Sequence, residues 1–314
     1  MADVLIVGNG VAGRKAAETL RKNGFKGSVV MVTDEMFPFY PRPRLSLGYL
    51  SGEVEKDKLF LAPDFYSRNA VSLVFEKVTA IEPENNRLIL QDGSGISYRI
   101  LLLATGASAA TPAWEGAELE GVVTLRTLVD ADNILERIKT QDTVVVAGAG
   151  ILGVEAADAL RKRGKDVTLL VRGGKEKVGS PTLEPDKAVM KCDELMSEGV
   201  NFCFDDEIEK LRGDGGVLSE VVTKQGMSIM TGLLIVTIGA RANIKLAEGT
   251  GIETGRGIVV DEQLKAVGSG NIYAAGDAAE LRDGVRDKHW HGGPYMSAMK
   301  QGEFAAGVIA ETLK

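Results

Sequence analysis

Two glycine-rich hexapeptides carry the clearest chemistry in the sequence. Residues 8–13 read GNGVAG and residues 148–153 read GAGILG, so both have the spacing Gly-x-Gly-x-x-Gly. In such a turn the first glycine permits a sharp bend, the second lets bare backbone approach a pyrophosphate, and the third lets the next helix pack on its strand. The N-terminus of that helix then offers unpaired N–H groups and partial positive charge. The two motifs therefore predict two dinucleotide sites. The candidate residues are Gly8, Gly10, Val11, Ala12 and Gly13 in the first, and Gly148, Gly150, Ile151, Leu152 and Gly153 in the second.

An acidic residue is expected about 20 residues after such a turn, where it binds the ribose hydroxyls of the adenosine. Asp34 and Glu35 stand at this distance from the first motif, and Glu35 is the preferred candidate. The alternative is an ordinary solvated loop acid.

The matching place in the second half holds Arg172, with Lys175 and Lys177 close behind. An arginine can pair with a 2′-phosphate that an acid would repel, which favours NADPH. Gly153, the third glycine, is the form more usual with NAD. The two cues conflict, so NADPH and NADH both stay open, with NADPH preferred.

Both motifs recur in the same structural context, because each follows a strand-like run and opens a helical one. The first copy has a strand at Asp3–Val7, a helix at Arg14–Asn23 and a strand at Ser28–Thr33. The second has a strand at Thr143–Ala147, a helix at Val154–Arg163 and a strand at Asp166–Arg172. This repeat predicts two βαβ units.

The remainder of each half also corresponds. Residues 71–104 and 200–237 alternate short strand patterns and close in Thr105-Gly106 and Ile238-Gly239. The last segment has a strand pattern, Asn271–Ala275, and a helical one from about Tyr295 to Leu313, which we expect to complete the first domain. The predicted fold is α/β with two Rossmann-like three-layer domains. We expect an FAD-binding domain of residues 1–110 and 243–314 and an NAD(P)-binding domain of residues 111–242.

Composition excludes several other classes of protein. The 314 residues carry a net charge of −7, which does not favour nucleic acid or an anionic membrane as a partner. No apolar run reaches the length of a membrane span, and the N-terminus lacks the features of a signal peptide, so we expect a cytoplasmic protein. Cys192 and Cys203 are interpreted as core residues. With His289 and His291 as the only histidines, no metal site is expected.

Taken together, these motifs resemble the pyridine nucleotide-dependent flavoprotein reductases that have two dinucleotide-binding domains. The resemblance rests on both fingerprints, on Ala104-Thr105-Gly106, on Glu155 after the second fingerprint, and on the run IYAAGD at residues 272–277. The segment PFYPRPRLS, residues 38–46, is most similar to NAD(P)H:rubredoxin reductases, the flavin-binding part of assimilatory nitrite reductases, and the ferredoxin reductases of oxygenase systems. The implied fold is that of glutathione and thioredoxin reductases without their C-terminal interface domain.

This resemblance implies roles for individual residues. The first fingerprint would bind the FAD pyrophosphate, Thr105 and Gly106 would form a turn beside FAD, and Asp277 would accept a hydrogen bond from the ribityl chain. Arg42 and Pro43 would lie along the flavin, and Glu155 would place the nicotinamide. The last helix would point its positive end at the flavin. Alternatives are a helix cap for Asp277 and a packed helix carboxylate for Glu155. Val78, Ala104, Gly239 and Gly276 complete the cofactor-binding candidates.

Three departures from the family pattern narrow the function. The place of a redox-active cysteine pair holds Pro41-Arg42-Pro43, so disulfide reduction is not expected. Oxygenase ferredoxin reductases often have Leu-Ser-Lys where this chain has Leu45-Ser46-Leu47, which removes one flavin contact. Many relatives add a C-terminal domain after the last helix, so a homodimer and a subunit of a larger complex both stay open.

The predicted function is transfer of hydride from a nicotinamide to FAD and of electrons onward to a small iron–sulfur or rubredoxin-like protein. Hydride transfer needs two stacked rings in a dry site and no protein acid or base. The alternatives are an NAD(P)H oxidase or quinone reductase, and a flavoprotein redox sensor. His289 and His291 precede the last helix, and proton delivery and ordinary loop packing are both open for them.

Overall fold

The computed structural model describes residues 1–282 and 294–314, which divide into two compact units. The first unit contains residues 1–41, 60–108 and the described part of 241–314. The second contains residues 42–59 and 109–240. His289 and His291 lie outside the described residues.

The first unit is built on a sheet with the strand order β3-β2-β1-β6-β5-β4, in which β18 also pairs with β6. Pairings among β1, β2, β3, β6 and β18 are parallel, whereas β4, β5 and β6 pair antiparallel. The strands are β1 (Ala2–Val7), β2 (Val29–Thr33), β3 (Val71–Phe75), β4 (Val78–Glu82), β5 (Arg87–Leu90), β6 (Gly95–Leu103) and β18 (Ile272–Ala274). A separate parallel pair is formed by β17 (Ile258–Val260) and β19 (Ala279–Leu281).

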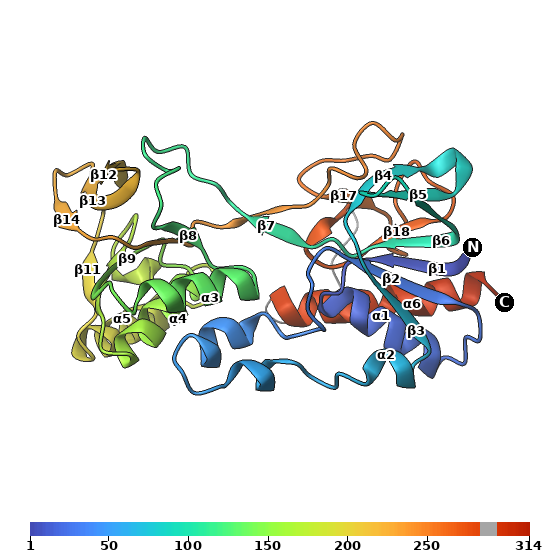
Figure 1. The fold of residues 1–314 in the computed structure, drawn as a ribbon, viewed down its shortest axis with the longest axis horizontal. Coiled ribbons are helices and arrows are strands. Elements are labelled where there is room, and N and C mark those ends of the chain that lie inside the picture. Colours follow the sequence, from blue (N-terminus) through green and yellow to red (C-terminus); the bar gives the residue numbers. More distant parts are fainter. Residues whose placement is uncertain (283–293) are drawn as a thin grey trace. The chain divides into compact units, whose positions relative to one another are not determined.

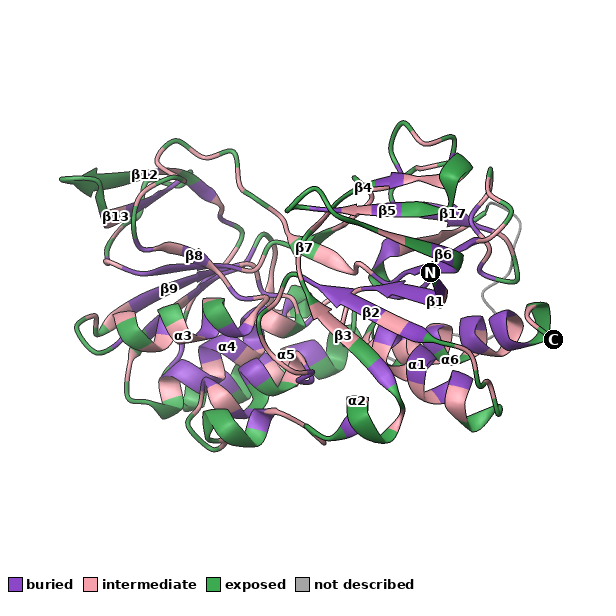
Figure 2. Ribbon diagram, turned by 45° about the vertical axis from the view of Figure 1, so that its right-hand side comes forward, coloured by how far each residue is buried: buried purple, intermediate pink, exposed green. Residues whose placement is uncertain are grey.

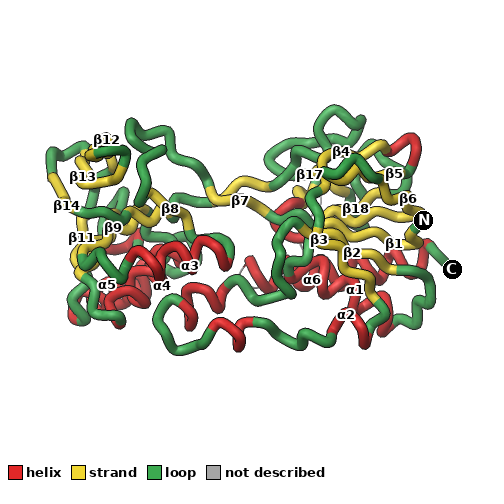
Figure 3. The backbone as a smooth tube through the Cα atoms, in the orientation of Figure 1, coloured by secondary structure: helices red, strands yellow, loops and turns green. Residues whose placement is uncertain are grey.

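Helices cover one face of this sheet (Figures 1 and 3). They are α1 (Val11–Lys22), α2 (Phe65–Arg68) and α6 (Pro294–Thr312), and α1 packs on α6. Helix α1 forms because small and apolar residues recur on one side, where Ala16, Ala17 and Leu20 are buried. It ends before Gly24, which has a φ of +81°.

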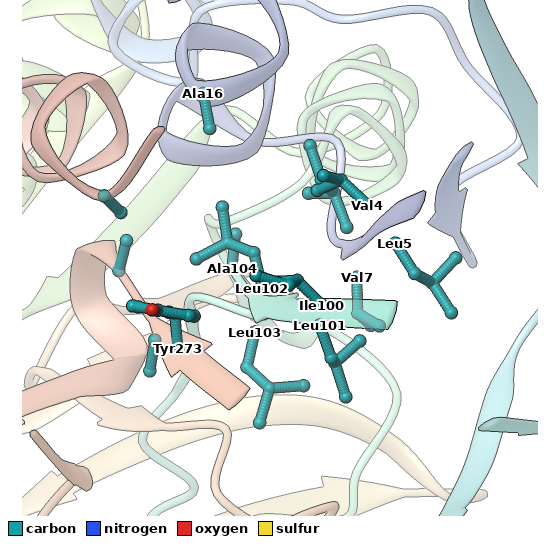
Figure 4. Close-up of a cluster of buried hydrophobic side chains, with 14 of the residues drawn as sticks. Val4, Leu5, Val7, Ala16, Ile100, Leu101, Leu102, Leu103, Ala104 and Tyr273 are labelled. Atoms are coloured by element: carbon teal, nitrogen blue, oxygen red, sulfur yellow. The ribbon is translucent and has the colours of Figure 1, made fainter. Parts of the chain in front are cut away.

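The core of the first unit lies on both faces of the central strands, one of which packs against α1 (Figure 4). Val4 and Leu5 of β1 and Leu101 and Leu102 of β6 are fully buried. Apolar residues follow one another without alternation in these strands because both faces of a parallel sheet are covered. Figure 2 shows the same pattern of burial in β1 and in β9 of the second unit.

The second unit repeats this plan with a parallel sheet in the order β11-β10-β9-β15-β8. Its strands are β8 (Val122–Thr124), β9 (Thr143–Ala147), β10 (Asp166–Leu170), β11 (Asn201–Cys203) and β15 (Leu234–Val236). Its helices are α3 (Leu128–Arg137), α4 (Ile151–Lys162) and α5 (Pro185–Ser197). An antiparallel sheet adds β12 (Ile208–Asp214), β13 (Val217–Thr223) and β14 (Ser228–Met230). The expected α/β fold with two Rossmann-like units is confirmed.

The 42–59 segment differs from the expected domain boundaries, because its contacts place it in the second unit rather than the first. It contains a π-helical turn, Leu45–Tyr49, which packs on α4 and α3. The Tyr49 hydroxyl donates to Asp132 Oδ1 at 2.6 Å, and Arg163 Nε donates to the carbonyl of Leu50 at 2.6 Å. These side chains come from α3 and α4, which explains why the segment groups with residues 109–240. The chain passes between the units at β7 (Ala107–Ala109) and β16 (Ala240–Ala242), which pair.

Candidate dinucleotide-binding sites

The first glycine turn joins β1 to α1. Gly8 has a φ of +111°, and a Cβ there would stand 2.2 Å from the carbonyl oxygen of Ala104. A Cβ at Gly13 would stand 2.1 Å from the carbonyl oxygen of Gly8. Both glycines are therefore required by the fold itself.

Gly10 differs from its two neighbours in the turn. A Cβ there would meet no atom of residues 1–282 or 294–314 within 4 Å. Gly10 is also the N-cap of α1, and no side chain caps the helix. The space beside Gly10 and the uncapped N–H groups suit an anion, as a pyrophosphate site requires.

The second turn, between β9 and α4, has the same construction. Gly148 has a φ of +103°, and a Cβ there would lie 2.6 Å from the carbonyl oxygen of Thr237. A Cβ at Gly153 would lie 1.9 Å from the carbonyl oxygen of Gly148, whereas one at Gly150 would meet only the carbonyl oxygen of Ser180 at 3.7 Å. Gly150 caps α4 without a side-chain hydrogen bond. Both turns thus pack on the chain just beyond a neighbouring strand, β6 in one unit and β15 in the other.

Glu35 follows β2 and is held by a tyrosine that the sequence analysis did not single out. The Tyr40 hydroxyl donates a short hydrogen bond to Glu35 Oε2, and Tyr40 is buried. The Glu35 amide donates to Thr33 Oγ1 at 3.3 Å. Asp34 is exposed. Glu35 is therefore the more firmly positioned of the two acids.

An aromatic cluster supports the first turn from the side. The Arg14 guanidinium lies 4.7 Å from the Phe39 ring centroid and 4.3 Å from that of Phe65. Tyr66 donates from its hydroxyl to Asn9 Oδ1 at 2.8 Å and accepts the Phe39 amide at 3.1 Å. Asn9 stands between Gly8 and Gly10, so this contact fixes the turn. Residues distant in the sequence form the cluster, so no local motif predicts it.

Thr105 and Gly106 form a turn that is closed by Asn243, a residue that the sequence analysis missed. Thr105 Oγ1 donates to the Asn243 carbonyl at 2.8 Å, and Asn243 Nδ2 donates to the Thr105 carbonyl at 2.9 Å. The Asn243 amide donates to the Gly106 carbonyl at 2.9 Å. Ala104 is buried directly before this turn. Three hydrogen bonds therefore hold Thr105 and Gly106 to Asn243.

Gly276 and Asp277 begin a short 3-10 helix, Gly276–Ala278, that lies next to the first glycine turn. A Cβ at Gly276 would stand 3.1 Å from the Ala12 side chain, and the Gly276 amide donates to Gln301 Oε1 at 2.8 Å. The Asp277 side chain is exposed. Val78, the first residue of β4, lies in the same unit and pairs with Leu90. The sequence candidates Gly8, Ala12 and Gly276 are thus brought together.

Arg42, Pro43 and Glu155 lie in the second unit. Arg42 Nη1 donates to the Arg126 carbonyl at 2.6 Å, and Ser46 Oγ donates to Glu155 Oε2 at 2.6 Å. Burial raises the pKa of the Glu155 carboxyl, and the hydrogen bond from Ser46 partly opposes that shift. Ser46 was not among the sequence candidates, since its partner lies 109 residues away.

Arg172 and Gly239 lie at the ends of β10 and β15. The Arg172 side chain is 80 % exposed, and its Nε is 3.8 Å from Glu207 Oε1. Glu207 also pairs with Lys224, which lowers the pKa of that carboxyl. Gly239 is exposed, with a φ of +119°. Arg172 is therefore an exposed cation that follows β10, the strand next to the one that leads into the second glycine turn.

The remaining sequence expectations concern cysteines, metals and membranes. Cys192 and Cys203 are free and buried. Within residues 1–282 and 294–314 no group of histidine, cysteine and acidic side chains is arranged to hold a metal ion. No helix in the same residues is long and apolar enough to cross a bilayer.

Two Rossmann-like units, each with an uncapped glycine turn, define a two-dinucleotide oxidoreductase. A model of the pyridine nucleotide-disulphide oxidoreductase family matches residues 2–302, and the chain belongs to this family. It is an NAD(P)H-dependent flavoprotein oxidoreductase whose cofactors are FAD and NADH or NADPH.

Curated relatives and solved structures agree with this family. The chain is 34 % identical to a rubredoxin-NAD(+) reductase of Pseudomonas putida over 282 residues, covering 89 % of this chain and 72 % of that protein. It is 31 % identical over 309 residues to the ferredoxin–NAD(+) reductase subunit of a benzene 1,2-dioxygenase system of the same organism, covering 98 % and 74 %.

Among solved structures, the ferredoxin reductase of the CYP199A2 system from Rhodopseudomonas palustris has a TM-score of 0.90 at 27 % identity, covering 98 % of this chain and 76 % of that one. The covalent putidaredoxin reductase–putidaredoxin complex has a TM-score of 0.89 at 27 % identity, covering 99 % and 75 %.

Proposed function

We propose that this protein takes hydride from a nicotinamide dinucleotide onto FAD and passes electrons to a small iron–sulfur or rubredoxin-like protein. The observation that carries the proposal is the pair of uncapped glycine turns, in each of which a Cβ on the second glycine would meet no atom of the described residues closer than 3.7 Å. Support for the acceptor comes from the relatives, which are named for rubredoxin and ferredoxin.

In this proposal the first unit holds FAD. The turn at residues 8–13 binds the pyrophosphate at the N-terminus of α1, and Glu35 binds the adenosine ribose. Thr105, Gly106, Gly276 and Asp277 line the remainder of the FAD site. Tyr40 and Tyr66 support the site indirectly, because their hydroxyls orient Glu35 and Asn9 through hydrogen bonds.

The second unit holds the nicotinamide dinucleotide on the turn at residues 148–153. Glu155, Arg42 and Pro43 lie in this same unit, and we assign Glu155 to placing the nicotinamide. Bound FAD supplies the chemistry, since it accepts a hydride and can release electrons singly. The protein's own part is to bind, to orient and to exclude water.

Arg172 favours NADPH over NADH. It is 80 % exposed, and its partner Glu207 is also paired with Lys224. An ion pair between exposed side chains is worth about 0–1 kcal/mol. Arg172 can therefore leave Glu207 for a 2′-phosphate at little cost. Action in the cytoplasm, and a homodimer or larger complex as the assembly, stay predictions.

The experiment that tests the function is anaerobic reduction followed by an acceptor panel. The purified protein should be yellow with FAD and should bleach on addition of NADPH. The reduced protein is then mixed separately with a ferredoxin, a rubredoxin, oxygen and a quinone. Fast reoxidation by an iron protein supports the proposal. Faster reoxidation by oxygen or the quinone supports an oxidase or quinone reductase, and a long-lived charge-transfer band supports a redox sensor. A protein that fails to take up FAD contradicts the whole assignment.

A further inference from the structure

A buried hydroxyl determines where the Glu155 carboxyl points. Ser46 lies in the π-helical turn Leu45–Tyr49, is 2 % exposed, and donates from Oγ to Glu155 Oε2 at 2.6 Å. Glu155 lies in α4, directly after the second glycine turn. The contact therefore ties the 42–59 segment to the helix that begins at the proposed nicotinamide site.

No cation pairs with Glu155 anywhere in residues 1–282 or 294–314. Leu47, which stands where relatives often have lysine, is 59 % exposed. The charged groups on α4 and on the elements packed against it have other partners. Four arginines donate to backbone carbonyls: Arg42 to Arg126, Arg44 to Lys58, Arg161 to Glu198 and Arg163 to Leu50. Asp158 pairs with Lys162, and Asp166 accepts a hydrogen bond from Asn201.

Ser46 can serve both protonation states of Glu155. Its Oγ lies 3.4 Å from the Pro43 carbonyl as well as 2.6 Å from the carboxyl. A hydroxyl donates one hydrogen and accepts through two lone pairs. With Glu155 charged, Ser46 donates to the carboxylate. With Glu155 neutral, the carboxyl can donate to Ser46 Oγ, and Ser46 can turn its hydrogen to Pro43.

We propose that Ser46 is a positioning residue that holds Glu155 beside the nicotinamide and lets the carboxyl gain and lose a proton there. The proposal rests on the role given to Glu155 above. Loss of hydride, which takes both bonding electrons, leaves the nicotinamide ring positively charged. A carboxylate stabilises that cation, so the proton of a neutral Glu155 is released to solvent when the oxidised coenzyme binds. Burial, which raises the pKa of Glu155, makes the neutral form accessible at milder pH than for an exposed glutamate.

The test measures binding of NADP⁺ to the FAD-loaded protein across pH, without turnover. The control ligand is 2′-phospho-ADP-ribose, which lacks the nicotinamide, so the ratio of the two affinities isolates the ring. This ratio should fall as pH is lowered through the pKa of Glu155. Glu155→Gln should make it independent of pH, with NADP⁺ bound as weakly as by the wild-type protein in acid.

Variants at positions 46 and 47 test Ser46 itself. Ser46→Ala should move the midpoint to higher pH and weaken NADP⁺ about tenfold near neutral pH, because it removes a hydrogen bond to a charged group. Ser46→Thr should restore the wild-type midpoint. Leu47→Lys should move the midpoint to lower pH, since a nearby cation favours the carboxylate. Ser51→Ala is the matched control, because Ser51 Oγ donates to the Gly48 carbonyl and accepts from the Glu53 amide, both within its own segment.

Two results would overturn the inference: a Ser46→Ala protein with the wild-type midpoint and ratio, or a Glu155→Gln protein that still titrates. These results differ from failure of the proposed function. In that case the wild-type protein would bind neither NADP⁺ nor NAD⁺, and neither 2′-phospho-ADP-ribose nor ADP-ribose, although FAD is retained.

Discussion

Gly153 lies so close to Gly148 that a Cβ on it would stand 1.9 Å from the Gly148 carbonyl oxygen. Gly13 has the same relation to Gly8, at 2.1 Å. In both turns the third glycine therefore serves helix packing. A Cβ on the second glycine would meet no described atom closer than 3.7 Å, so this glycine is left to serve the ligand. Substitutions can separate these two roles.

Gly10→Val should leave the fold intact and abolish retention of FAD, because the new side chain enters space needed by the pyrophosphate. Gly13→Ala should instead reduce folded yield with or without FAD. Gly307→Ala is the control, since a Cβ at this helical glycine also meets nothing within 4 Å. That variant should keep its flavin and gain up to about 1 kcal/mol of stability. Flavin absorbance and circular dichroism measure both effects. A yellow Gly10→Val protein would refute the assignment of the first turn.

Arg172→Glu should lower kcat/KM for NADPH by about 10- to 100-fold, as loss of a charge-assisted pair and introduction of repulsion predict. The value for NADH should change little. Lys187→Glu makes the same change of charge at an exposed position on α5 and should affect neither coenzyme. Steady-state rates of flavin-dependent dye reduction give the comparison. Equal losses of kcat/KM with NADPH and NADH would show that Arg172 does not bind the 2′-phosphate.

Both thiols should resist modification in the folded protein. Burial, followed by the hydrogen bond to Asp206, raises the pKa of Cys203 to about 11, and burial also raises the pKa of Cys192. A raised thiol pKa leaves less reactive thiolate in mildly alkaline buffer, and thiolate should appear only as pH approaches the higher value. A colorimetric thiol reagent should therefore react slowly until denaturant is added, and then with both cysteines. Rapid reaction of the native protein would contradict the buried assignment.

Tyr98→Phe should be neutral or stabilising by up to about 1 kcal/mol, because the Tyr98 hydroxyl is buried without a hydrogen-bond partner in the part of the chain that the structure describes. Burial raises the pKa of this phenol to about 12, with the Glu84 charge adding to the shift. Tyr66→Phe is the contrasting variant and should cost about 1–2 kcal/mol, since its hydroxyl bonds Asn9 and Phe39. Urea unfolding measures both changes. A larger loss from Tyr98→Phe than from Tyr66→Phe would show that the buried hydroxyl has a partner.

The sequence was most informative where function depends on neighbouring residues. The spacing of Gly8, Gly10 and Gly13 predicted a strand, a turn and a helix, and all three are present. The helix begins at Val11 rather than Arg14, because the last residues of the motif form its first turn. Such local rules need no knowledge of the rest of the chain.

Contacts between distant residues escaped the sequence analysis. Asn243 closes the turn at Thr105 from 138 residues away, and Ser46 reaches Glu155 from 109. Asn243 belongs to no motif, and Ser46 stands at the end of the 38–46 motif, which does not indicate a contact with Glu155. Both contacts depend on how distant parts of the chain pack. The sequence did not indicate the packing of the 42–59 segment on α3 and α4 either, since a short linker shows no hydrophobic period that reveals which unit it packs on.

Insertion of the late strand β18 beside β6, and packing of α6 on α1, have a consequence for biosynthesis. Gly302 of α6 lies so close to α1 that a Cβ there would stand 2.1 Å from the Ala12 carbonyl oxygen. The helix that we propose receives the flavin pyrophosphate is therefore completed only after α6 has been made. Residues 109–240 can begin to fold before α6 has been made, whereas flavin capture at the proposed site must await α6.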